Sequence, residues 1–120
     1  MASIDRALAD PLLFGTALGD PSTWATWRVV LKAAFALGLT EAERATFSEI
    51  AGGRQPPQDR VRQLWAIAGR RGGKSRMAAL ISCYLATCLD HRAYLAPGEI
   101  GYVLAIAPTQ RQAQGMLSYC

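Results

Sequence analysis

The sequence predicts an α/β fold in which a parallel sheet, incomplete and flanked by helices, follows an N-terminal helix pair. Two short apolar runs, 64–68 and 101–107, are typical of strands buried in a parallel sheet. Between them, the strongly apolar stretch from Lys74 to about Leu89 is typical of a buried helix. A strand, a helix and a strand in this order form a βαβ unit, which predicts that the two strands are parallel.

Composition limits the classes of protein to which this chain can belong. Its 120 residues make one domain or a piece of one, and a 51% hydrophobic content excludes intrinsic disorder. The longest uncharged apolar run, 77–89, is too short to span a bilayer, and the first ten residues contain no apolar signal core, so we expect a cytoplasmic protein. The spacing of Cys83, Cys88 and Cys120 matches no metal or redox motif, and we expect free thiols.

The first half of the chain, 1–60, is predicted to be a helical region leading into the main domain. Residues 3–9 can form a short helix. A longer helix is expected after Asp20, a favourable N-cap that precedes a proline, and apolar residues then recur at helical spacing up to a stop at Gly38. We expect the aromatic residues of this helix to pack in the core rather than to form a stacking platform: Trp24, Trp27 and Phe35.

A second helix of this region is predicted to begin after Thr40. Thr40 and Glu43 have the spacing of a capping box, and the helix can continue to Gly52. The second half of the chain, 61–120, is predicted to hold the start of the α/β core. Its last helix, over 110–119, follows a threonine that can cap it.

A phosphate-binding motif lies between the first predicted strand and the helix after it: Ala68, Gly69, Arg70, Arg71, Gly72, Gly73, Lys74 and Ser75. Ala replaces the usual first glycine. Gly72 and Gly73 allow backbone N–H groups to turn towards an anion, and the helix N-terminus adds partial positive charge. Lys74 can bridge the β- and γ-phosphates, and the Ser75 hydroxyl can bind Mg²⁺. The motif predicts a site for ATP and Mg²⁺, which includes the adjacent Arg76; the alternative is a glycine-rich turn with incidental basic residues.

Basic residues concentrate around this motif. Seven of the thirteen lie between Arg54 and Arg76, where Asp59 is the only acid. The net charge of +4 therefore favours an anionic partner at this part of the chain. The planar guanidinium of Arg70 or Arg71 could contact the γ-phosphate, but loop tips also carry arginines for solvation, and the sequence leaves both roles open.

Acidic residues suited to ATP hydrolysis are missing. Hydrolysis at such a site needs an acidic strand end, where carboxylates complete the Mg²⁺ shell and orient water. After Lys74 the acids are Asp90 and Glu99, and neither follows a predicted strand. We therefore expect a truncated N-terminal piece of a larger ATPase that at most binds nucleotide weakly and does not hydrolyse it alone.

Three segments, 20–35, 64–77 and 102–113, together resemble the N-terminal part of the ATPase domain of tailed-bacteriophage terminase large subunits. The resemblance implies a P-loop NTPase fold and an ATP-driven motor that moves double-stranded DNA into the capsid. It further implies a homo-oligomeric ring in the cytoplasm of the bacterial host, with the portal protein and the terminase small subunit as partners.

The resemblance also assigns roles to single residues. It implies that Lys74 and Ser75 bind the phosphates and Mg²⁺, and that Arg70 corresponds to the loop arginine of these motors, so that Lys74 and Arg70 would serve catalysis in the parent protein. The Walker B acids and the nuclease domain of the family would lie beyond Cys120. Two alternatives stay open: a fragment of a helicase-like P-loop ATPase, and a non-catalytic nucleotide-binding or interaction fragment.

Overall fold

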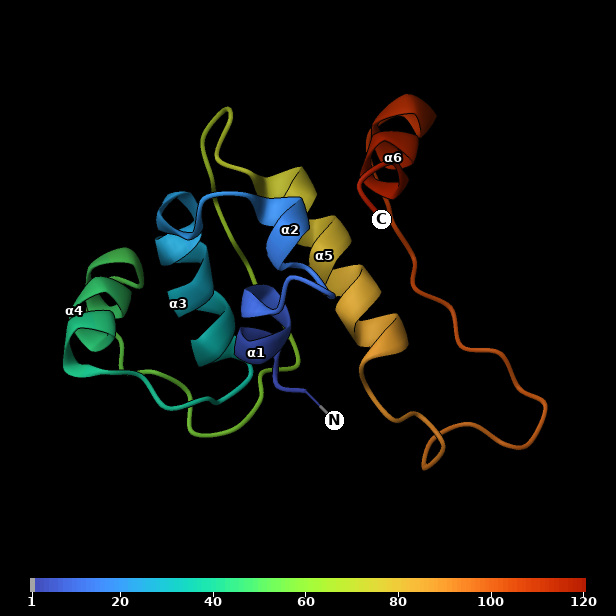
Figure 1. Cartoon of the computed structure of the whole chain (residues 1–120), viewed down its shortest axis with the longest axis horizontal. Coiled ribbons are helices and arrows are strands. Elements are labelled where there is room, and N and C mark those ends of the chain that lie inside the picture. The colour runs from blue at the N-terminus through green and yellow to red at the C-terminus, as the bar shows by residue number, and fades with distance from the viewer. Residues whose placement is uncertain (1) are drawn as a thin grey trace. The chain divides into compact units, whose positions relative to one another are not determined.

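The computed structural model describes residues 2–120, and residue 1 lies outside them. Every regular element in this range is a helix (Figure 1). The chain divides between Trp65 and Ala66 into two compact units. The N-terminal unit holds α1 (Ile4–Ala9), α2 (Gly15–Leu18), the 3₁₀ helix η1 (Pro21–Trp24), α3 (Ala25–Ala34) and α4 (Glu41–Ile50). The C-terminal unit holds α5 (Lys74–Thr87) and α6 (Gln110–Leu117).

The predicted α/β fold with a parallel sheet is wrong, because residues 2–120 contain no strand. The apolar runs 64–68 and 101–107 are irregular, and their large side chains face solvent, with Trp65 87% and Ile106 86% exposed. A strand requires a neighbour that pairs with its backbone N–H and C=O groups. Parallel pairs are the weaker kind, and two strands alone are marginal. Without such pairing, the architecture is not that of a P-loop NTPase.

Helix α3 is the centre of the N-terminal unit, where it contacts α1, η1 and α4. Ile4 of α1 and Leu31 of α3 are fully buried. The core of the unit also includes Trp24, which is 8% exposed, so its prediction as a core residue is confirmed. Trp27 and Phe35 are half-buried. Val29, Leu31, Ala33 and Ala34 of α3 are also buried, and because they lie around the helix at 100° per residue, α3 is enclosed on more than one side.

Side chains cap three helix starts of this unit, and the caps at Asp20 and Thr40 confirm the prediction from the sequence. The Ser3 hydroxyl accepts from the Arg6 N–H before α1, and the Asp20 carboxylate accepts from the Ser22 N–H before η1. Thr40 and its partner in the capping box exchange both expected hydrogen bonds at the start of α4. The predicted stop at Gly38 is wrong, because α3 ends at Ala34.

Two ion pairs connect the helices of the N-terminal unit. Lys32 Nζ of α3 lies 2.7 Å from Glu43 Oε2 of α4, and Arg28 Nη2 of α3 lies 2.7 Å from Asp5 Oδ1 of α1. The Val61 N–H also donates to the carbonyl of Ala34 at 2.9 Å, so the chain after the helices returns to the end of α3. These contacts connect α3 to α1, to α4 and to the segment that follows α4.

Helices α5 and α6 pack against each other and confirm the two helices predicted for the second half of the chain. Met77, Ala79, Leu80 and Tyr84 of α5 are buried. The Arg76 guanidinium lies 5.3 Å from the centre of the Tyr119 ring, a cation–π contact between the start of α5 and the residues after α6. None of the helices in residues 2–120 has the length and apolar run needed to cross a membrane.

Candidate phosphate-binding site

The predicted phosphate motif forms a tight turn that leads directly into α5. The Gly72 N–H donates to the Gly69 carbonyl at 3.1 Å, which closes the turn around Arg70 and Arg71. A Cβ atom at Gly72 would lie 3.1 Å from the Gly69 carbonyl oxygen, so a side chain there would crowd the turn. Arg71 has a φ of 62° and Gly73 a φ of 75°, both in the left-handed region. Glycine adopts this left-handed backbone without steric cost, which explains why position 73 is a glycine.

Lys74, the first residue of α5, turns its side chain back over this turn. Its Nζ atom donates to the Gly69 carbonyl at 3.4 Å, so that one oxygen accepts from both Gly72 and Lys74. The lysine is exposed. The ammonium group is thus held next to the backbone of the loop by a weak contact that a phosphate oxygen could replace.

The N-terminus of α5 lacks the side-chain cap that the other two α-helices after α3 have. Thr40 caps α4 and Thr109 caps α6, each by accepting a backbone N–H, whereas Gly73 offers α5 no side chain. The backbone N–H groups of Lys74 and Ser75 consequently have no acceptor within the described chain. Backbone N–H groups without an acceptor at a helix N-terminus attract anions, and the helix dipole adds to this attraction.

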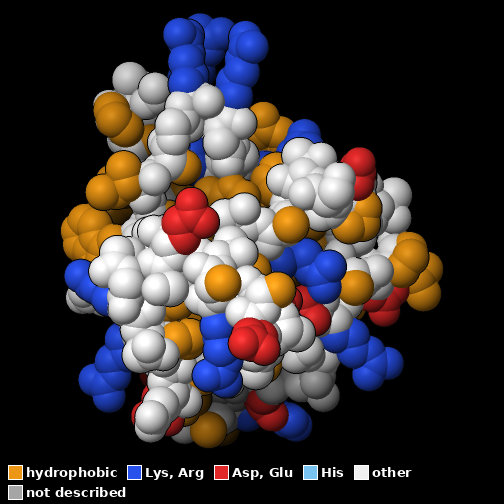
Figure 2. Space-filling model, turned by 90° about the vertical axis from the view of Figure 1, so that its left-hand side faces the viewer, with side chains coloured by type: hydrophobic (Ala, Val, Ile, Leu, Met, Phe, Trp, Pro, Cys, Tyr) orange, Lys and Arg blue, Asp and Glu red, His pale blue; other side chains and the backbone are white. Residues whose placement is uncertain are grey.

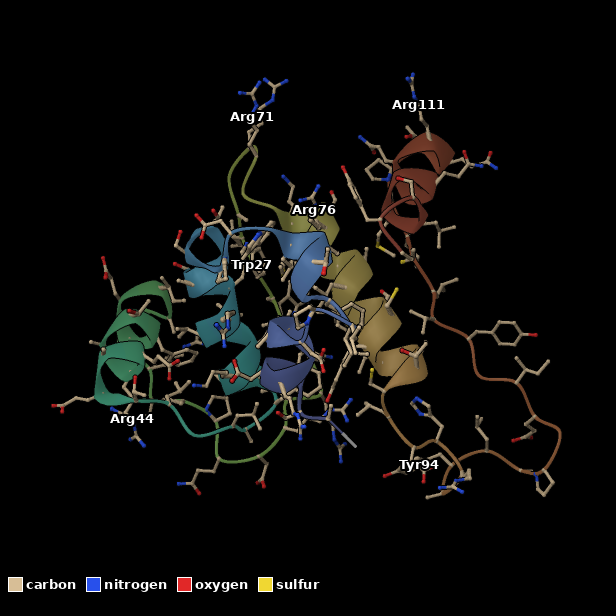
Figure 3. All side chains as sticks on the ribbon, in the orientation of Figure 1. Trp27, Arg44, Arg71, Arg76, Tyr94 and Arg111 are labelled. Carbon is tan, nitrogen blue, oxygen red and sulfur yellow. The ribbon has the colours of Figure 1, made fainter. Side chains whose placement is uncertain are left out.

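The net positive charge of the chain lies in the C-terminal unit, which holds this loop. Residues 66–120 contain six basic and two acidic residues, a net charge of +4, whereas residues 2–65 contain seven of each. Arg70 and Arg71 are exposed and form no hydrogen bond or ion pair within residues 2–120. Figure 3 shows Arg71 at the loop tip, pointing away from the backbone, and basic side chains project into solvent at the top of Figure 2. A cationic loop of this kind favours an anionic ligand.

The two acids of the C-terminal unit already have partners. Asp90 Oδ2 lies 2.6 Å from Arg92 Nη2, and this guanidinium holds the pKa of Asp90 below its ordinary value. Glu99 accepts the Ala96 N–H at 2.8 Å. Asp90 also follows the C-terminal end of α5, a helix of 14 residues, which places it roughly 20 Å from the loop at 1.5 Å per residue. It is therefore too far away to act at a phosphate bound there.

Hydrogen bonds join three of the predicted site residues, and two others lie in the first turn of α5. Gly69, Gly72 and Lys74 are joined by hydrogen bonds, and Ser75 is exposed in the first turn of α5. Arg76 contacts the ring of Tyr119, a residue that the motif alone does not indicate. Residues 2–120 contain no cluster of three or more His, Cys, Asp or Glu side chains that could hold a metal ion.

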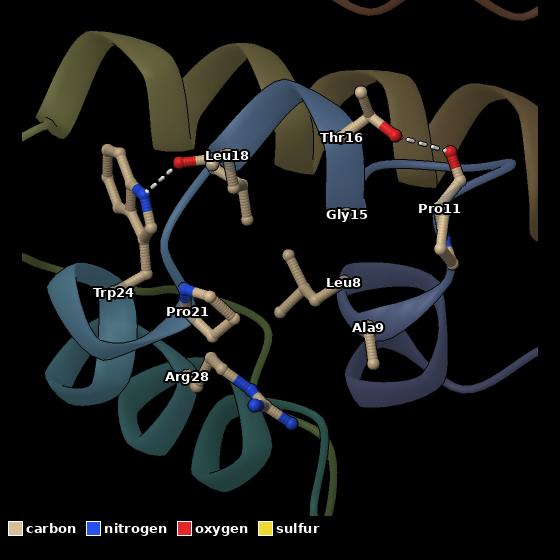
Figure 4. A pocket seen from close by; sticks show the side chains of 10 residues that line it. Leu8, Ala9, Pro11, Gly15, Thr16, Leu18, Pro21, Trp24 and Arg28 are labelled. Carbon is tan, nitrogen blue, oxygen red and sulfur yellow. Dashed lines mark hydrogen bonds between the residues drawn. The ribbon is translucent and has the colours of Figure 1, made fainter.

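A separate pocket of about 320 Å³ lies within the N-terminal unit (Figure 4). Leu8, Leu18 and Trp24 form apolar walls, and the Trp24 indole N–H donates to the Leu18 carbonyl at 2.6 Å. Arg28 also lines it, with its charge paired to Asp5. The pocket has the size of a small ligand but offers no unpaired charge to orient one.

Comparison with known proteins adds no relative, since no protein-family model, curated protein or solved structure matches the chain. The assignment of the loop before α5 as the candidate site therefore depends on its geometry alone, namely the position of Lys74 and the uncapped N-terminus of α5.

Proposed function

We propose that the loop 68–75 binds the phosphate groups of ATP, and that the chain is the ATP-binding segment of a DNA-packaging motor of the terminase large subunit type. The observation that carries the proposal is the position of Lys74, whose ammonium lies over the turn at the uncapped start of α5. Two kinds of donor, an ammonium and helix N–H groups, thus stand next to each other at one exposed place. Phosphate groups are the ligands that use both.

Magnesium would reach this site together with the nucleotide. The Ser75 hydroxyl is the protein oxygen that the motif offers, and no acid occurs between Arg60 and Leu89. Mg²⁺ tolerates such a sparse protein shell because it keeps several waters and takes phosphate oxygens as its other ligands. The residues present therefore fit a metal that is held mainly by ATP.

Hydrolysis requires a carboxylate that this unit does not place at the loop. Asp90 is paired to Arg92 beyond the far end of α5, and Glu99 is bonded to a backbone N–H. We therefore propose binding without turnover for this chain alone, with hydrolysis in the parent motor. Double-stranded DNA is the proposed substrate that the motor moves, and the net charge of +4 in residues 66–120 would favour contacts with its phosphate backbone.

Titration of the chain with Mg²⁺ and a slowly hydrolysed ATP analogue tests the proposal. Lys74→Ala should weaken binding by at least about tenfold, because it removes the charge nearest the phosphates. Arg111→Ala is the matched control, since Arg111 is an exposed cation of the same unit outside the loop. Its loss should change the affinity by no more than about twofold at physiological ionic strength, where distant charges are screened.

Competition experiments identify the part of the nucleotide that is recognised. Inorganic triphosphate should displace the ATP analogue, and adenosine should not, because the proposed contacts are all to phosphate. Equal affinity of the Lys74→Ala variant and the parent would overturn the site assignment. Binding that Arg111→Ala weakens as much as Lys74→Ala would indicate nonspecific attraction to a cationic surface, and would likewise contradict a built site.

A further inference from the structure

Cys120 lies against the turn of α5 that carries Cys83. Cys120 Sγ lies 3.8 Å from the carbonyl oxygen of Ala79 and 3.8 Å from that of Met116. In an α-helix the carbonyl of residue 79 points towards the N–H of Cys83, one turn later. The Cys120 sulfur therefore lies beside the turn of α5 that carries Cys83.

The two cysteines of this pair differ in their surroundings. Cys83 is half-buried on α5, whereas Cys120 is exposed. Burial, followed by the hydrogen bond with Cys120, raises the pKa of the Cys83 thiol to about 11. Cys120 is consequently the thiol that a solution reagent reaches first, and Cys83 is the inner partner.

The third cysteine has another neighbour. Cys88 Sγ lies 3.6 Å from the Thr87 hydroxyl, at the C-terminal end of α5. It comes five residues after Cys83, a spacing that places the two side chains on different faces of a helix. Cys120 therefore contacts the turn that carries Cys83, whereas Cys88 contacts the Thr87 hydroxyl, a difference that the spacing of the cysteines in the sequence does not reveal.

We propose that Cys83 and Cys120 form a redox-active dithiol that a low-molecular-weight disulfide converts into a disulfide bridge between α5 and the residue three positions after the end of α6. With oxidised glutathione, the Cys120 thiolate attacks one glutathione sulfur and releases the first glutathione thiolate. The Cys83 thiolate then attacks the Cys120 sulfur of the mixed disulfide and releases the second. One protein disulfide forms, one glutathione disulfide is reduced, and the protons of both cysteines pass to the released thiolates.

The experiment is incubation of the whole chain with oxidised glutathione, followed by alkylation of the remaining thiols and tryptic peptide mapping without reductant. Cleavage at Lys and Arg places Cys83 and Cys88 together in peptide 77–92 and Cys120 in peptide 112–120. We expect these two peptides to be joined, with Cys88 alkylated. Chymotryptic cleavage after Tyr84 separates Cys83 from Cys88 and so identifies the bridged residue.

Single serine variants provide the controls. Cys88→Ser should form the bridge to the same extent as the parent, whereas Cys83→Ser should stop at a glutathione adduct on Cys120 that a reductant removes. A bridge from Cys88 to Cys120, a bridge between Cys83 and Cys88, or a parent chain that stops at the glutathione adduct would overturn the proposal. Because the parent map is itself decisive, the outcome does not depend on the folding of any variant.

Discussion

Substitution of Gly73 tests whether the backbone conformation of the phosphate loop determines its affinity for the ATP analogue. Its φ of 75° lies in the left-handed region, where a Cβ atom meets the following carbonyl, at a cost of roughly 1–2 kcal/mol. Gly73→Ala should therefore reduce the free energy of unfolding by about that amount. If phosphate binding requires this backbone, the same energy lowers the population of the competent loop, and the apparent affinity for the ATP analogue falls roughly 5- to 30-fold.

Gly98 supplies a matched control for that prediction. It has a φ of 88° and belongs to the same unit but not to the loop. A Cβ atom added at Gly98 would have no other atom within 4 Å. Gly98→Ala should thus carry the same backbone strain without loss of affinity. Gly73→Asn should fall between parent and alanine variant, because asparagine adopts left-handed backbone more readily.

Two measurements on each variant separate stability from binding. Urea unfolding followed by far-ultraviolet circular dichroism reports the strain, and titration with a fluorescent ATP analogue reports the affinity. The reasoning would be refuted by a Gly73→Ala chain that is destabilised yet binds as tightly as the parent. It would also fail if Gly98→Ala reduced the affinity to the same extent, since strain anywhere in the unit would then be sufficient.

Two further predictions concern the N-terminal unit. Hydrogen bonds from Lys32 and then from the Thr40 N–H lower the pKa of Glu43, so this carboxylate stabilises the fold above the ordinary value of 4.5 and loses that contribution as the pH falls through the lowered pKa. Urea unfolding should therefore show less loss of stability below pH 4.5 in Lys32→Met than in the parent, and an equal loss would contradict this. Leu31→Ala should cost about 2–5 kcal/mol of unfolding free energy. Leu12→Ala should change it by less than about 0.5 kcal/mol, since Leu31 is 0% and Leu12 93% exposed; similar losses in urea unfolding would contradict that packing.

Helix starts could be predicted from the sequence because their determinants are local. A capping side chain reaches a backbone N–H only two or three residues away, as Asp20, Thr40 and Thr109 all do. The end of α3 was not predictable in this way. Gly38 supplies a stop in the sequence, but the left-handed residue after the helix is Ala36, with a φ of 54°, and the Leu37 N–H donates to the Lys32 carbonyl at 2.8 Å.

The sheet was mispredicted because strand formation depends on a distant partner. An apolar run such as 64–68 or 101–107 has the composition of a buried strand, but composition does not provide the second backbone that it must pair with. A helix forms its backbone hydrogen bonds within one segment and therefore needs no distant partner. The same sequence patterns therefore predicted the helices well and the strands wrongly.

Part of the candidate site could be predicted and part could not. The glycines and Lys74 occur within a few residues of each other, so a motif indicates their proximity. The contact of Arg76 with Tyr119 and that of the Cys120 sulfur with the Ala79 carbonyl join residues about forty positions apart, and they exist only because α6 packs on α5. No local pattern encodes such neighbours.

The irregular stretch 101–107 also affects how this chain behaves in concentrated solution. It carries no charge and exposes large apolar side chains, among them Tyr102 at 89% and Leu104 at 80%. Uncharged segments of this kind are prone to pair with identical segments of other molecules. The net charge of +4 opposes such encounters, but salt screens it within about 10 Å at 0.1 M ionic strength. Solubility of the chain therefore depends on a balance between pairing of this segment and repulsion between like charges. Higher ionic strength weakens the repulsion and so favours aggregation.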